Sequence, residues 1–212
     1  MTTKQNSILV TTPIGEVNWF KLIKPDDKYN KYQCDLILDD SEAVQSLLAQ
    51  VEELTEAKIE ELKGEAKNPA AATKIKDSGN RPILPEYDDE GEETGRYVLK
   101  MSSPAQIKKK DGTLMDMYPP KVFDARGKEI KGESRDSLRV GSGSTMRANL
   151  EVRVYGNSSI GCGVSLRPKA VQIVELKEWG NSGGGFDAVE GGFEIQEESS
   201  FDNPDTGESG DF

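Results

Sequence analysis

The chain has 212 residues, of which 34% are hydrophobic and 31% charged, and its formal net charge is −11. This length can bury a core without help from disulfides or metals, but the low apolar fraction predicts an additional polar part that does not fold. Histidine is absent and only two cysteines occur, which excludes histidine-dependent catalytic triads and four-ligand zinc sites and favours a reduced intracellular compartment.

The first third of the chain predicts two strands and a helix. Residues 7–20 alternate loosely and are interrupted at Pro13-Ile14-Gly15, residues 24–27 are typical of a turn, and residues 32–38 form the second strand. Apolar residues then recur at helical spacing, after possible caps at residues 39–41 and before Gly64. We therefore expect one helix over about 41–63.

The middle and late parts of the chain predict short strands joined by turns. Residues 67–80 lack periodicity and predict a loop. Expected strands lie at 82–87, 96–101, 122–124, 150–155 and 161–176. An acidic turn at 88–93 and a basic turn containing Lys108, Lys109 and Lys110 fall between them. Several short strands with one helix favour a mainly β fold, a small antiparallel barrel.

The last residues differ in composition from the rest. Residues 179–212 hold nine acidic residues and no lysine or arginine, so residues 1–178 hold the other 29 acidic residues against all 27 basic ones, a net charge of −2. We expect a folded domain over 1–179 and a disordered acidic tail over 180–212. A tethered polyanion can occupy its own domain's cationic groove, and a terminal aromatic can enter a partner's apolar pocket. The alternative is a tail that only promotes solubility.

Basic residues interleaved with aromatic rings are the second informative pattern. Single-stranded nucleic acid needs cations for its phosphates and rings that stack on its bases. The candidates are Lys21, Lys24, Lys28, Tyr29, Lys31, Tyr32, Lys108, Lys109, Lys110, Arg139, Arg147, Arg153 and Tyr155. A solvated surface charge is the alternative for each lysine, and core packing for each aromatic. Trp19 and Phe20 are adjacent in a strand, so they should face opposite ways and belong to the core only in part.

Other chemistry finds little support. The glycine- and serine-rich residues 139–145 lack the spacing and the lysine of a nucleotide-binding loop. The acidic run 88–93 lacks the alternating ligands of a calcium loop and is better explained as a solvated turn. No catalytic constellation, metal site or cofactor motif emerges, so we do not expect an enzyme.

The order and spacing of several segments resemble the phage-encoded single-stranded DNA-binding proteins of the podovirus, or T-odd phage, type. The resemblance covers most of the chain. It rests on residues 24–26 with 32–36, 122–128, 141–144 with 152–155, 160–166, 171–176, 183–187 and 211–212.

This resemblance implies an OB-fold, a five-stranded antiparallel barrel with one helix, that binds single strands without sequence preference. It implies that Tyr155 stacks on a base, that Lys31 and Lys108–Lys110 contact phosphates, and that Asp211 and Phe212 engage a polymerase and a helicase-primase. The chain departs from the family at Gly156-Asn157-Ser158, where a second aromatic would stand, and its tail is shorter and less acidic. Stacking should then be weaker or use another ring, and tail competition should be milder.

We therefore expect a protein that coats single-stranded DNA during phage replication and recombination. Arg147 and Arg153 would add to its DNA-binding surface. The chain lacks an apolar signal segment and an apolar run of about 18 residues, so we expect no membrane contact and a location in the cytoplasm of the infected bacterium. A homodimer is left open. The alternatives are an interaction module that mimics DNA toward a host protein and, more remotely, a nuclease that uses carboxylate-bound metal.

Overall fold

Strands dominate the computed structural model, which describes residues 7–73, 75, 81–157 and 161–178. The elements are β1 (Ser7–Thr11), β2 (Gly15–Asp26), β3 (Lys31–Asp39), α1 (Glu42–Gly64), α2 (Pro69–Ala72), β4 (Ile83–Tyr87), β5 (Glu93–Pro104), β6 (Gln106–Lys108), β7 (Leu114–Asp116), β8 (Lys121–Phe123), α3 (Gly132–Asp136), β9 (Thr145–Asn157) and β10 (Gly161–Glu175). The prediction of a mainly β fold is confirmed.

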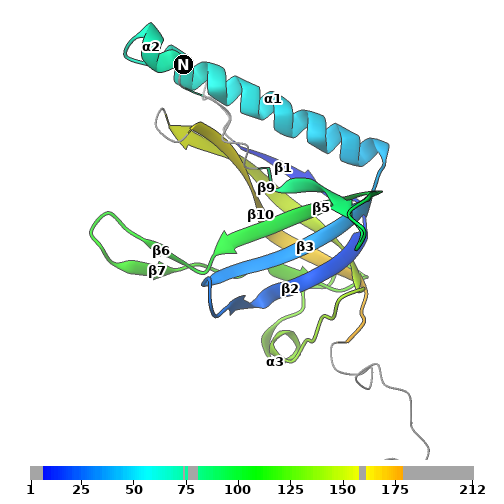
Figure 1. Cartoon of the computed structure of the whole chain (residues 1–212). Helices are drawn as coiled ribbons and strands as arrows, with labels where there is room; N and C mark the ends of the chain where they lie inside the picture. Colours follow the sequence, from blue (N-terminus) through cyan, green and yellow to red (C-terminus); the bar gives the residue numbers. More distant parts are fainter. Residues whose placement is uncertain (1–6, 74, 76–80, 158–160, 179–212) are drawn as a thin grey trace, which may run out of the picture. The chain divides into compact units, whose positions relative to one another are not determined.

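Five of these strands pair in a closed circuit, in the order β2–β3–β5–β10–β9 and back to β2. Four of the contacts are antiparallel. The contact between β5 and β10 is parallel, with Leu166 opposite Met101, so the expectation of an entirely antiparallel arrangement is wrong at this contact. The chain between the two strands is long enough to return in the same direction, as parallel neighbours require. The strands β1, β4 and β8 extend the circuit from outside (Figure 1).

The core lies inside this circuit because each strand alternates between inward and outward side chains. On β3, Tyr32, Cys34, Leu36 and Leu38 are buried, while the residues between them are at least partly exposed. Leu36 stands opposite Val17 on one side and Leu99 on the other, and all three are fully buried. Each register pair thus adds apolar area to one continuous core.

The helix α1 confirms the expected helix, shifted by one residue at each end. The Oγ of Ser41 accepts a hydrogen bond from the backbone N–H of Val44 at 3.3 Å, which caps the first turn. The buried face of the helix packs on β9 and β10, where the buried Thr55 donates its hydroxyl to the carbonyl of Val51. In the described part of the chain, no helix is long and apolar enough to cross a membrane.

The structure corrects the sequence analysis in several loops. The strand β2 does not end at Phe20 but continues through the expected turn to Asp26, and the turn falls at residues 27–30. There the carboxylate of Asp26 accepts hydrogen bonds from the backbone N–H groups of Lys28 and Tyr29. The structure has two short helices, α2 and α3, in addition to α1, whereas the sequence predicted a single helix. The first lies in the expected loop 67–80 because Asn68 caps it and Pro69 begins it.

Candidate nucleic-acid interface

The predicted basic turn is the tip of the hairpin formed by β6 and β7, which extends away from the five-stranded circuit (Figure 1). Lys108, Lys109 and Lys110 are all exposed on it. The turn is well defined, because the N–H of Lys109 donates to the carbonyl of Thr113 at 2.8 Å. The Thr113 hydroxyl and N–H also donate to Asp111 and lower the pKa of its carboxyl.

Lys31 lies at the base of the same hairpin. The N–H of Ala105 donates to the carbonyl of Asn30 at 2.9 Å, and the Asn30 amide donates to Gln106 at 3.1 Å. The structure therefore brings Lys31 and the three hairpin lysines to one end of the molecule, where β2 ends, β3 begins and β5 ends.

We call this region the cationic end. It comprises Lys21, Lys24, Lys28, Lys31 and Lys108–Lys110, all exposed. Within the described ranges, no ion pair engages any of these lysines. Lys28 lies over the ring of Tyr29, 5.1 Å from its centroid. The same region holds Asp26, Asp27, Asp111 and Asp116, so its seven lysines outnumber its four carboxylates and leave a net positive charge that is available to phosphates.

The other three predicted residues, Arg147, Arg153 and Tyr155, lie on the outer side of β9. They alternate with buried residues such as Val152 and Val154, so the predicted outward direction of the Tyr155 ring is confirmed. The side chain of Tyr155 is 38% exposed. One donor of the Arg147 guanidinium is already used, because its Nε donates a hydrogen bond to the side-chain oxygen of Gln172 at 2.7 Å.

Further cations stand beside them on β10. Lys169 pairs with Glu151 at 2.8 Å, and Arg167 stands opposite Glu151 in the register. The hydrogen bond from Lys169 lowers the pKa of the Glu151 carboxyl, and the charges of Lys169, Arg167 and Arg153 act in the same direction. This group, which we call the β9 face, thus carries more positive than negative charge. It comprises Arg147, Arg153, Tyr155, Arg167 and Lys169.

The cationic end and the β9 face are separate groups that share one outer surface. Lys21 stands opposite Gln33, and Gln33 opposite Ser102. Because Leu166 pairs with Met101 in parallel, the next residues on the two strands, Arg167 and Ser102, follow side by side. One outward row therefore runs from the cationic end to Arg167 and on to Glu151 of β9, whose carboxylate is paired with Lys169.

The next outward row on this surface contains a half-buried carboxyl group. Asp35 stands opposite Asn18 on one side and Lys100 on the other. Burial raises the pKa of Asp35, and the charge of Lys100 opposes that change. A carboxylate here interrupts the positive surface, whereas the carboxylate of the first row, Glu151, is paired with Lys169. The first row is therefore the better path for phosphates.

Sequence reasoning did not single out Trp19 as a functional residue. Its side chain is 64% exposed, whereas Phe20 packs against the core, as expected for neighbours in a strand. Strict alternation from the buried Val17 would place Trp19 inward, whereas in the structure Phe20 shares its side of the strand with the buried Leu22. The bulge that re-aims Trp19 leaves no mark in the sequence.

The two cysteines belong to the core. Cys34 and Cys162 are both buried and unpaired with one another. Burial, and secondarily the charge of Asp35, raises the pKa of the Cys34 thiol well above its ordinary value, which disfavours the reactive thiolate. No group of three metal-binding side chains occurs in the portion of the chain that the structure describes.

Comparison with known proteins links this geometry to single-stranded DNA-binding proteins of phages. No protein-family model and no curated protein matches the sequence. Among solved structures, gp2.5, a single-stranded DNA-binding protein encoded by bacteriophage T7, is 22% identical with a TM-score of 0.63; the match covers 90% of this chain and 100% of that one. The C-terminally truncated single-stranded DNA-binding protein of bacteriophage Enc34 is 16% identical, with a TM-score of 0.52 and coverage of 82% and 88%.

The chain therefore has the fold of these phage proteins, and the predicted OB-fold is confirmed. The roles of the individual site residues stay predictions, as does the domain boundary at 179/180. The acidic tail, with Asp211 and Phe212, lies outside the described residues.

Proposed function

We propose that this protein binds single-stranded DNA without sequence preference and without catalysing a reaction. The observation that carries the proposal is the fold, which two single-stranded DNA-binding proteins of phages share. The surface supports it independently, because exposed lysines at the cationic end and arginines on the β9 face lie along one side of the fold. Tyr155 supplies a partly exposed ring beside them.

The proposal is tested with fluorescently labelled oligo-dT, a mixed-sequence single strand and the corresponding duplex. Anisotropy titrations from 50 mM to 500 mM salt should show tighter binding to both single strands than to the duplex. The logarithm of affinity should fall with that of salt by about 0.7 for each phosphate neutralised. Equal affinity for the duplex, or no dependence on salt, contradicts the proposal. Complete absence of binding would favour the DNA-mimic alternative.

We further propose that the protein coats and protects single strands during phage replication and recombination, in the cytoplasm of the infected bacterium. In this role the acidic tail competes with DNA for the cationic surface and recruits a polymerase and a helicase-primase through Phe212. The support is the charge of the tail, nine acidic residues and no basic one in residues 179–212, which favours both roles.

Two truncations separate these roles of the tail. Removing residues 186–212 should tighten binding to single strands, most at low salt, where the competition is unscreened. Deleting Phe212 alone keeps all nine acidic residues, so DNA affinity should stay near that of the wild type while capture of the phage polymerase falls sharply. Unchanged affinity of the longer truncation at low salt disproves competition, and full polymerase capture without Phe212 disproves the anchor.

A further inference from the structure

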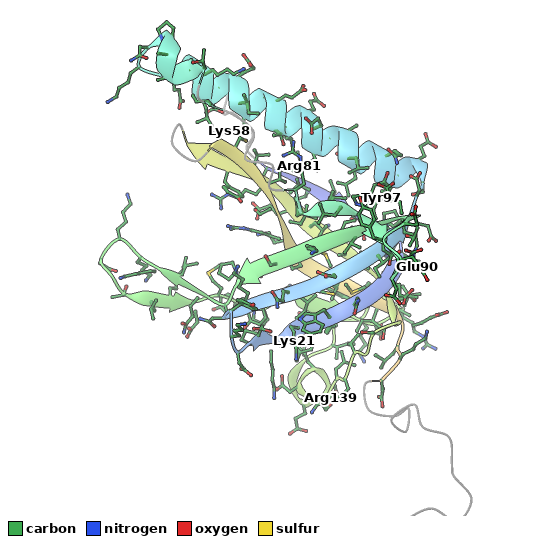
Figure 2. All side chains as sticks on the ribbon, in the orientation of Figure 1. Lys21, Lys58, Arg81, Glu90, Tyr97 and Arg139 are labelled. Carbon is green, nitrogen blue, oxygen red and sulfur yellow. The ribbon has the colours of Figure 1, made fainter. Side chains whose placement is uncertain are left out.

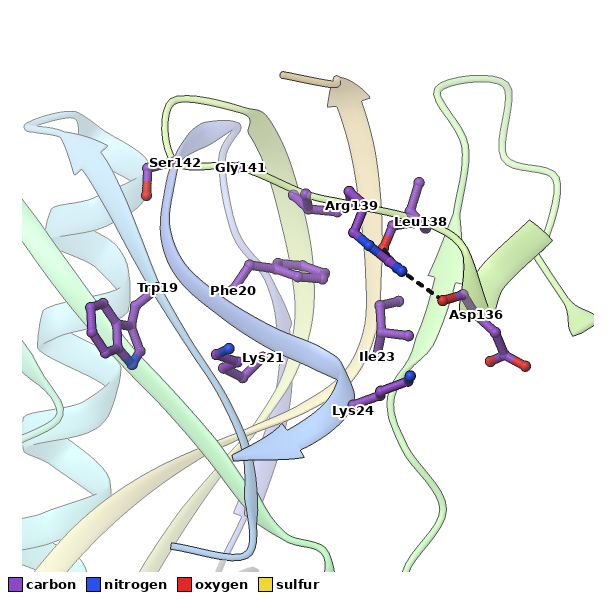
Figure 3. Close-up of a pocket in the computed structure, with 11 residues that line it drawn as sticks. Trp19, Phe20, Lys21, Ile23, Lys24, Asp136, Leu138, Arg139, Gly141 and Ser142 are labelled. Carbon is purple, nitrogen blue, oxygen red and sulfur yellow. Dashed lines mark hydrogen bonds between the residues drawn. The ribbon is translucent and has the colours of Figure 1, made fainter. Parts of the chain in front are cut away.

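A cavity of about 420 Å³ opens between β2 and the segment 136–142 that follows α3 (Figure 3). We call it the bulge pocket. Its apolar lining comes from Phe20, Ile23, Leu138 and Val140. Lys21, Lys24 and Arg139 contribute positive charge, and Trp19 lies at one end of the cavity with Asp136 at the other. This volume falls within the range of sites that hold small organic ligands, about 300–1,000 Å³.

The walls of the bulge pocket are held together on both sides. At the Trp19 end, the Ser142 hydroxyl donates to the side-chain oxygen of Asn18 at 3.0 Å, and the N–H of Gly143 donates to the carbonyl of Val17 at 3.0 Å. At the other end, the Arg135 guanidinium donates to the carbonyl of Leu22 at 3.2 Å. The cavity is therefore built into the fold, and a ligand needs little rearrangement to enter it.

Trp19 adopts an unfavourable backbone conformation at this cavity. Its φ is 56°, a left-handed value that a bulky side chain rarely takes and that strains the backbone. The register between β2 and β3 shifts between Asn18 and Lys21, so the strand bulges here and turns the indole outward, where 64% of the residue is exposed. Burial of the indole does not offset the strain, which points to a role in binding.

The positive charges of the bulge pocket are available to a ligand. The guanidinium of Arg139 is fixed by backbone carbonyls, those of Asp136 at 3.1 Å and Leu138 at 3.4 Å (Figure 3). Because carbonyls carry no net charge, its positive charge is not neutralised. Among the residues described, neither Lys21 nor Lys24 forms an ion pair. The fitting ligand has a flat ring and an anionic group.

We propose that the bulge pocket is a subsite for one nucleotide of the bound strand. Its base stacks on Trp19 and its phosphate contacts Lys21, Lys24 and Arg139. The inference rests on the proposed single-stranded DNA binding and adds to the surface formed by the cationic end and the β9 face.

The indole itself reports on the subsite. The chain has two tryptophans, Trp19 and Trp179, so Trp179→Phe leaves Trp19 as the only source of indole fluorescence. We expect oligo-dT to quench this emission over the same concentration range in which the anisotropy of the labelled oligonucleotide rises.

Two variants in the otherwise wild-type chain test the contacts. Trp19→Gly should weaken binding roughly 5- to 150-fold, as expected for the loss of one stacked base. Its melting temperature should not fall, because glycine accepts a positive φ. Arg139→Gln should weaken binding and reduce the salt slope, whereas the controls Tyr87→Ala and Arg126→Gln, exposed residues outside the pocket, should bind like the wild type.

The outcomes separate the subsite from the proposed function. Binding of oligo-dT without quenching of Trp19, together with Trp19→Gly and Arg139→Gln affinities equal to those of the controls, overturns the subsite and leaves single-stranded DNA binding intact. Failure of the wild type to bind oligo-dT overturns both.

Discussion

The outer face of β2, β3 and β5 carries opposite charges at its two ends, although the same three strands build both. At the cationic end, where β3 begins, the lysines lack ion-pair partners within the described ranges. At the opposite end, Arg96 pairs with Glu86 at 2.6 Å and with Glu16 at 3.6 Å. Further carboxylates surround this pair. They are Asp39, Asp40, Asp88, Asp89, Glu90, Glu92 and Glu93, and we call this region the acidic end.

The difference shows that the local charge of this surface cannot be read from the net charge of −11 or from the near-neutral balance of residues 1–178. A phosphate backbone is attracted at one end of the face and repelled at the other. If the protein binds DNA as proposed, we expect the acidic end to limit how far the strand extends along β3. Figure 2 shows Lys21 beside β2 and Glu90 at the far end of the strands.

The largest effect on stability is expected from a substitution in the core of the five-stranded circuit, which positions the two ends. Leu36 is fully buried between β2 and β5, so Leu36→Ala should lower the free energy of unfolding by about 2–5 kcal/mol. The control Leu9→Ala removes a side chain that is 68% exposed and should change it by less than about 0.5 kcal/mol. Urea denaturation measures both; equal effects would contradict the assigned core.

Neutralising the hairpin lysines should remove much of the charge difference between the cationic end and the acidic end. Changing Lys108, Lys109 and Lys110 to alanine should lower the slope of log affinity against log salt by about 2, at about 0.7 per contact. The loss of affinity relative to the wild type should then be about 100-fold larger at 0.1 M salt than at 1 M salt. Matched neutralisation of the acidic end, Asp89→Asn with Glu90→Gln and Glu92→Gln, should leave the slope unchanged. A hairpin variant with the wild-type slope would show that the hairpin does not contact DNA.

Tyr155 tests whether the path continues from the cationic end to the β9 face. Tyr155→Ala should weaken binding of single strands by about 1–3 kcal/mol through lost stacking. The urea midpoint should change little, because the ring lies on the outer side of β9. A large loss of stability with unchanged DNA affinity would instead identify the ring as part of the packing.

The smallest effect concerns Asp35, which lies between the two ends. Burial raises its pKa in the folded state, so its contribution to stability is fully present below the unfolded-state pKa and is lost as the pH rises through the folded-state pKa. Asp35→Asn should therefore be slightly more stable than the wild type at pH 7. The gain should vanish below about pH 4, where the carboxyl is protonated. Urea midpoints at both pH values measure it, and a gain that grows in acid contradicts the assignment.

Local signals in the sequence were sufficient for the elements with strong periodicity. The helix, with a cap among residues 39–41, and the two hairpins with their acidic and basic turns follow from spacing and turn chemistry alone, and the structure identifies Ser41 as the cap. The outward direction of Tyr155 follows from its alternation with Val154. These features depend on neighbours a few residues away, which a sequence displays directly.

Other features depend on contacts that the sequence does not display. The parallel pairing of Leu166 with Met101 joins strands far apart in the chain, and no local pattern marks it. The bulge at Trp19 arises where β2 must pair with β3 and also reach Asp26. The division of the predicted DNA contacts between the cationic end and the β9 face likewise follows from register, which residue spacing alone did not provide.

The closed circuit also sets the order in which the chain can fold during synthesis. The strands β2, β3 and β5 emerge from the ribosome first and can pair at once, but β2 waits for β9, which begins at Thr145 and pairs with Glu16 across most of the chain. Contacts between such distant residues form slowly because loop closure costs entropy. Until β9 and β10 arrive, the nascent sheet, in which β4 also pairs with β5, exposes its apolar face and the open edge of β2. The newly made chain is therefore most prone to aggregation before its last two strands are complete.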